Sequence, residues 1–144
     1  MDSPLPRPDH MLGNPYAPRL VAAGETFDVV EVDDVLGACV LERLRRQGVV
    51  VGPVLHDRRY RRMGFFVPVS PKGATWRDRR GPRHHGKGAW ITFPPLVSDG
   101  RDFLVWRVPP RDCGAPTPLR LVREAITTAS AALNASPDRR PGGR

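Results

Sequence analysis

Two closely spaced carboxylates near residue 30 are the first side chains in this sequence that could do chemistry. Glu31 and Asp33 stand two residues apart in an apolar stretch, and side chains two apart on a β-strand point to the same face. A hard divalent cation such as Mg²⁺ takes a few carboxylate oxygens and completes its shell with phosphate and water. The spacing therefore fits a metal site. Because a carboxylate just before a helix also commonly caps that helix, the two interpretations stay open.

Positive charge is concentrated in one segment, residues 57–87. The chain has 23 Lys and Arg against 15 Asp and Glu, a formal net charge of +8, and this segment alone holds ten of the cations and only two aspartates. Clustered cations attract and steer polyanions, and such binding weakens as salt rises. The alternative is a solvated basic loop with no specific ligand. We expect nucleic acid or phosphate to contact this set: Arg58, Arg59, Arg61, Arg62, Lys72, Arg79, Arg80, Arg83, Lys87 and Phe65.

Two adjacent aromatic residues, Phe65 and Phe66, follow the first arginines of that segment. Adjacent side chains on a strand face opposite sides of the sheet, so one phenylalanine should enter the core. The other could offer a stacking surface to a base, and we assign this role to Phe65.

Two adjacent histidines, His84 and His85, lie between glycines farther along the chain. They have no third ligand nearby, and the glycines lack the spacing of a phosphate-binding loop before a helix. We therefore expect only a flexible basic loop that could lie over a phosphate backbone.

Apolar patterning predicts the elements that must position these residues. Strands are expected at 27–32, 49–55, 64–69, 89–93 and 103–108. A first helix should begin after Asp33 or Asp34 and end at Gly48, and a second should follow Thr117. Pro68 belongs at a strand end or an edge, because it cannot donate a hydrogen bond to a neighbouring strand. The predicted fold is α+β, a single mostly antiparallel sheet with two helices packed on one face.

The ends of the chain and its composition set the domain organisation. Residues 1–24 are rich in proline and predict an extended arm, residues 25–135 form the domain, and residues 136–144 predict a disordered tail. The sequence shows no signal peptide and no apolar run long enough to span a membrane, so we expect a cytoplasmic protein with no membrane role. Cys39 and Cys113 are expected as free thiols.

The order of these motifs resembles the N-terminal domain of bifunctional DNA primase/polymerases, the prim-pol family. The matching stretches are 29–33, 62–68, 77–81, 86–91 and 93–95, together with the helix that contains Gly37. The resemblance implies a prim-pol core, related to RNA-recognition motifs. It also implies that Glu31, Asp33 and Asp78 hold Mg²⁺ or Mn²⁺ for two-metal phosphoryl transfer, with the basic segment binding nucleotide and template.

The functional prediction depends on one departure from that family. Where the family carries a histidine, this chain has Arg62-Met63-Gly64. We therefore expect a protein that binds nucleic acid or nucleotide without polymerase activity. One alternative is an active, metal-dependent nucleotidyltransferase that uses Glu31, Asp33 and Asp78. Another is a protein-interaction module that contacts a protein partner through residues 1–24 or exposed tryptophans.

Overall fold

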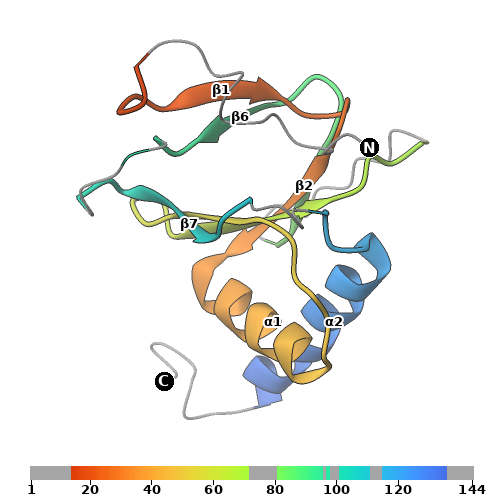
Figure 1. Cartoon of the computed structure of the whole chain (residues 1–144). Coiled ribbons are helices and arrows are strands. Elements are labelled where there is room, and N and C mark those ends of the chain that lie inside the picture. The colour runs from red at the N-terminus through yellow and green to blue at the C-terminus, as the bar shows by residue number, and fades with distance from the viewer. Residues whose placement is uncertain (1–13, 72–80, 96, 98–100, 111–114, 136–144) are drawn as a thin grey trace.

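The computed structural model describes residues 14–71, 81–95, 97, 101–110 and 115–135. Seven strands and two helices are formed within these residues (Figure 1). In chain order they are β1 (Arg19–Ala22), β2 (Asp28–Asp33), α1 (Asp34–Arg46), β3 (Val54–Asp57), β4 (Arg62–Val67), β5 (Arg83–His85), β6 (Trp90–Phe93), β7 (Leu104–Val108) and α2 (Leu119–Ala135).

The elements form three layers, with the larger sheet in the middle (Figure 1). This sheet has the strand order β5-β2-β4-β3-β7, and all of its pairings are antiparallel. Helices α1 and α2 cover one face, and a second sheet made of β1 and β6 lies over the other. The predicted α+β fold with two helices on one face is confirmed. The expectation of a single sheet needs correction, because β1 and β6 pair separately from the other five strands.

The central strands β2 and β4 send alternate side chains to the two faces. Val30, Val32 and Phe65 pack with the helices in one apolar cluster, whereas Val29 and Phe66 belong to a second cluster on the opposite face. This alternation follows from the pleat of a strand. Each of these two strands therefore serves the helix layer and the β1–β6 layer at once.

Helix α1 starts and stops where its sequence provides caps. The side chain of Asp33 accepts a hydrogen bond from the backbone of Leu36, and Gly48 takes a positive φ of 76° just past the last turn. The helix packs closely on β4 at Gly37, where an added Cβ would lie 2.8 Å from the Cβ of Met63. Glycine at this position thus brings the helix backbone against the sheet.

The space between the two sheets is partly filled by aromatic rings. Phe27, Phe66 and Phe93 lie with ring centroids 4.7 to 5.8 Å apart, and Trp106 packs against the last two. Ring pairs at such distances add to the stability that burial provides. This aromatic cluster joins the small sheet to the larger one.

The structure departs most clearly from the sequence prediction at β1, β3 and β5. Strand β1 lies inside the segment predicted as an arm, so the folded part begins before residue 25. Strand β3 begins at Val54 because the preceding backbone runs against the start of α2, where the N–H of Gly52 donates to the hydroxyl of Thr117. Strand β5 was not predicted at all. Pro68 directly follows the end of β4, as expected.

The two helices differ in length but neither approaches a membrane span. Helix α1 has 13 residues and α2 has 17. Within the described residues, neither is long and apolar enough to cross a bilayer.

Candidate functional site

A cleft of about 720 Å³ opens between the two sheets. This volume falls in the range of sites for small organic ligands. Strands β2, β3, β4 and β5 contribute residues from the larger sheet, and β6 contributes Trp90, Ile91 and Thr92 from the small one. The turn between β3 and β4, the segment from Asp102 to the first residue of β7, and two prolines that flank the small sheet, Pro18 and Pro95, complete the lining. The cleft thus lies on the face of the larger sheet that the helices leave free.

Gly64 lies opposite Glu31 on the neighbouring strand and is closely packed. The two residues are partners in the β2–β4 register, and both line the cleft. A Cβ added to Gly64 would lie 2.9 Å from a methyl group of Val29, so a larger side chain would displace its neighbours. The absence of a side chain at this position lets Val29 pack closely against β4.

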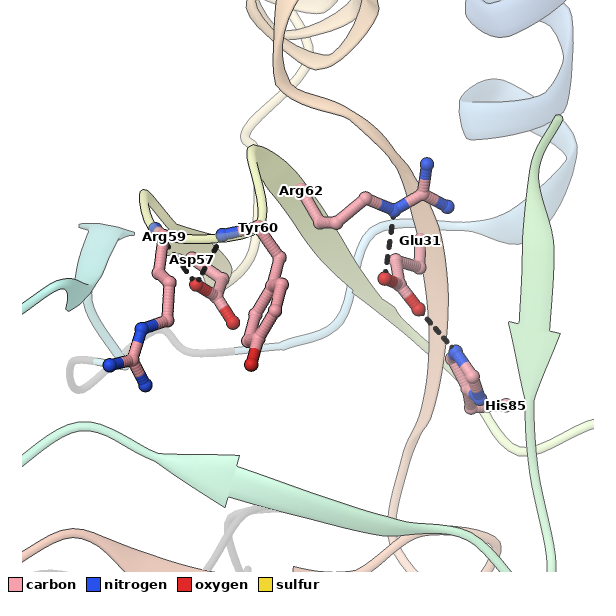
Figure 2. A network of polar contacts seen from close by, with 6 residues as sticks. All are labelled: Glu31, Asp57, Arg59, Tyr60, Arg62 and His85. Carbon is pink, nitrogen blue, oxygen red and sulfur yellow. Dashed lines mark hydrogen bonds and ion pairs between the residues drawn. The ribbon is translucent and has the colours of Figure 1, made fainter. Parts of the chain in front are cut away.

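Glu31 is held by one basic side chain from the strand on each side of β2 (Figure 2). Arg62 on β4 donates from Nε to Oε2 at 2.9 Å, and His85 on β5 places Nε2 at 2.6 Å from Oε1. The three side chains are between 22% and 28% exposed, so water still reaches the network. Both carboxylate oxygens of Glu31 therefore have a partner.

This network lowers the pKa of Glu31 from 4.5 to about 2. The hydrogen bond from His85 is the largest cause, and the hydrogen bond and positive charge of Arg62 act in the same direction. Partial burial opposes them, since it disfavours the charged form. Glu31 is accordingly ionised at neutral pH and carries a fixed negative charge in the cleft.

Three exposed aromatic side chains line the cleft. Tyr60, Trp90 and Phe103 line it and are 68%, 65% and 45% exposed. The guanidinium of Arg59 lies 4.7 Å from the ring centre of Phe103, a cation–π contact. Asp57 shapes this turn by accepting from the backbone of Arg59 and of Tyr60 (Figure 2). These rings offer flat surfaces on which a planar ligand can stack.

Glu31 and Asp33, two of the three proposed metal ligands, have different structural roles in the described part of the chain. Asp33 caps α1 through its contact with Leu36 at 2.9 Å and does not line the cleft, so its capping role is the one observed. Asp78 falls outside the described residues. Among the residues that are described, no group of three or more His, Cys, Asp and Glu is arranged to hold a metal ion.

The predicted phosphate-binding cations lie in different surroundings. Arg62 and Arg83 line the cleft, whereas Arg61 and Lys87 are exposed elsewhere. Arg58 donates to the backbone carbonyl of Asp102. Lys72, Arg79 and Arg80 lie outside the described residues.

The prediction that Phe65 offers a stacking surface to a base needs correction. Its side chain is fully buried and packs in the apolar cluster under the helices. Phe66 is also fully buried, in the aromatic cluster on the other face. Neither ring is accessible to a base, because each face of the sheet is covered at this point along β4.

Sequence reasoning missed the roles of the two histidines. Strand β5 pairs with β2, and its adjacent histidines meet carboxylates on opposite sides of the sheet. His84 Nε2 lies 2.8 Å from Asp28 in the buried interior, and His85 contacts Glu31 in the cleft. A signal existed in the pairing of adjacent histidines with acids on both faces of 27–32. The glycines around 83–85 concealed it, because they favoured a loop.

Comparisons with known proteins do not assign this site. A scan against protein-family models and searches of curated proteins and solved structures find no match to the chain. The resemblance to the prim-pol family therefore remains a prediction from motifs. The function is inferred below from the residues that line the cleft.

Proposed function

We propose that this protein binds nucleic acid or a nucleotide in the cleft between its two sheets and does not polymerise DNA. The proposal is based on one observation, that exposed aromatic rings and arginines line the same cleft. Tyr60, Trp90 and Phe103 line it together with Arg62 and Arg83. Every base has a π-face that can stack on an aromatic ring, and a guanidinium matches the geometry of phosphate.

The charge distribution of the chain supports the same ligand. Strands β4 and β5, which supply Arg62 and Arg83, both lie within residues 57–87, the segment that holds the whole positive excess. A local excess of cations raises the concentration of polyanions near the cleft. The rings would then contact bases while the cations contact the backbone.

The partners of the carboxylates argue against polymerase activity. Both oxygens of Glu31 are engaged by basic side chains, and Asp33 caps a helix. A divalent cation at Glu31 would have to approach the positive charge of Arg62, which lies 2.9 Å from the carboxylate. Binding without metal-dependent phosphoryl transfer is the function that this arrangement favours.

Fluorescence anisotropy with labelled single-stranded and duplex DNA across a salt series tests the binding proposal. We expect binding at low salt that weakens steeply as salt rises, because phosphate contacts release counterions. Arg83→Gln should reduce the steepness of this salt dependence, whereas Arg46→Gln, on the exposed side of α1, should leave it unchanged. No binding at low salt, or a flat response to salt, would contradict the proposal.

Primer extension with Mg²⁺ or Mn²⁺ tests the nucleotidyltransferase alternative. We expect no extension by the wild-type protein. If extension occurs, Asp33→Asn separates the two roles of this residue, because asparagine caps helices about as well as aspartate but is a poor metal ligand. Extension that is abolished in this variant while its stability is retained would establish the alternative.

A further inference from the structure

The hydrogen bonds of Glu31 show which group occupies the donors of Arg62 and His85 when no ligand is present. We propose that Arg62 and His85 form a binding site for one phosphate group, and that Glu31 occupies this site as an internal competitor until a ligand displaces it. The inference rests on the proposed function, since it names the group of the nucleotide or nucleic acid that binds there. It goes further by giving Glu31 an inhibitory role in place of metal binding.

Two hydrogen-bond donors converge on one anion in the cleft. Arg62 and His85 come from the strands on either side of β2, and both meet the carboxylate of Glu31 in the lining of the cleft. Carboxylates and phosphates accept the same charge-assisted hydrogen bonds from such donors. A pair of donors that holds one anion at 2.6 and 2.9 Å is able to hold the other.

Arg62 has a further donor that Glu31 does not use. Figure 2 shows Nε facing Glu31 while the two terminal nitrogens of the guanidinium point away from it. Of these, Nη2 is buried and has no hydrogen-bond partner among the described residues. A buried donor without a partner is unfavourable. A phosphate is larger than a carboxylate and has more acceptor oxygens, so a shift of the Arg62 guanidinium would allow it to engage both Nε and Nη2.

The three side chains are accessible enough for one anion to replace another. The side chains of Glu31, Arg62 and His85 are each about a quarter exposed, and all three line the cleft. A ligand can therefore reach the donors while the carboxylate turns away. Since only molecules with a displaced carboxylate bind, the apparent affinity of the wild-type protein falls by the fraction in that state.

Isothermal titration with inorganic phosphate and with a nucleoside monophosphate, at low salt and without divalent metal, tests the inference. Glu31→Gln removes the competing charge but keeps the shape of the side chain, and we expect affinity to rise by about tenfold or more. Asp57→Asn is the matched control, because it removes another carboxylate that lines the cleft without freeing Arg62 or His85. Its gain should not exceed about threefold, the size of a charge effect through water.

Two further variants keep the test informative if Glu31→Gln fails to fold. Glu31→Asp keeps the charge on a shorter side chain that cannot span both donors, so affinity should rise by a smaller amount. Adding Arg62→Gln to Glu31→Gln should abolish the gain. Phosphate affinity that stays at the wild-type value in both Glu31 variants, or that falls, would overturn the inference.

The two proposals fail in different ways. If wild-type protein binds single-stranded DNA but Glu31→Gln gains nothing for phosphate over Asp57→Asn, the internal competitor is wrong and the binding function stands. If Glu31→Gln gains affinity for phosphate but no variant binds nucleic acid or nucleotide, the competitor is confirmed and the proposed function is wrong.

Discussion

The two faces of the larger sheet differ although the same strands build both. The helix face is closed by apolar side chains, among them Val30, Val32 and Phe65, which are at most 1% exposed. The opposite face carries Glu31 and Gly64 at neighbouring positions on the same strands, and there the sheet is only partly covered. One residue along β2 or β4 thus separates a packed core from an open cleft.

The difference shows that the cleft face of the larger sheet is packed less completely than the helix face. A glycine in a strand interior has no side chain to pack, and desolvation of the charges offsets part of what a partly buried ion pair contributes. Both lie on the cleft face. Positions that depart from good packing while the rest of the sheet keeps it are the expected locations of binding sites.

The largest expected effect is on the helix face, at Phe65. Phe65→Ala should lower the free energy of unfolding by about 3–5 kcal/mol, because it removes a fully buried ring and leaves a cavity. Denaturant unfolding measures this change. Tyr60→Ala on the cleft face should change stability by less than about 0.5 kcal/mol, since its side chain is exposed. Similar losses in both variants would remove the distinction between the two faces.

A smaller loss is expected where α1 meets β4. Helix propensity alone predicts that Gly37→Ala stabilises the protein by about 1 kcal/mol. The approach of Met63 predicts the opposite, a loss of about 1–3 kcal/mol, because the added methyl group overfills the contact. Thermal unfolding gives the sign directly, and a gain in stability would show that this contact is loose.

On the cleft face, the expected effect is on binding. Trp90→Ala should weaken binding of single-stranded nucleic acid by about 1–3 kcal/mol, the contribution of stacking one base, with little change in stability. Leu20→Ala is the control, because Leu20 is equally exposed at 65% but does not line the cleft. Equal losses in the two variants would indicate binding through exposed apolar surface in general.

The smallest effect concerns the Glu31 network and depends on pH. Because folding lowers the pKa of Glu31, its contribution is present above about pH 4.5 and is lost as pH falls toward 2. Allowing for screening by water, wild type should be about 1–2 kcal/mol more stable than Glu31→Gln at neutral pH. Urea unfolding should show this advantage shrinking between about pH 5 and pH 3. An advantage that does not change with pH would mean that the network is absent.

The sequence predicted the local features of the fold better than the distant ones. The start of α1 after Asp33 or Asp34 and its end at Gly48 were predicted, because capping depends on residues a few positions apart. The contact between Glu31 and His85 spans 54 positions and depends on the pairing of β5 with β2. Strand β5 has only three residues and lies between glycines, so nothing local marks it as a strand.

The candidate site was predicted in part for the same reason. Alternation along a strand indicated that Phe65 and Phe66 face opposite sides, but not that both sides would be covered. The sequence indicated that Glu31 is a candidate functional carboxylate. Its contacts with Arg62 and His85 became apparent only from the strand order. Tyr60, Trp90 and Phe103 come together through the packing of the two sheets, which no spacing in the sequence shows.

Mapping of a bound single-stranded oligonucleotide by amide and indole NMR shifts tests most directly whether the cleft face is the binding face. We expect the largest shifts at Gly64, His85 and the indole of Trp90, with weakening as salt is added. The exposed helix positions Ala38 and Ala131 should not shift. Saturating ligand that shifts the helices, or leaves the cleft residues unchanged, would contradict a binding site between the two sheets.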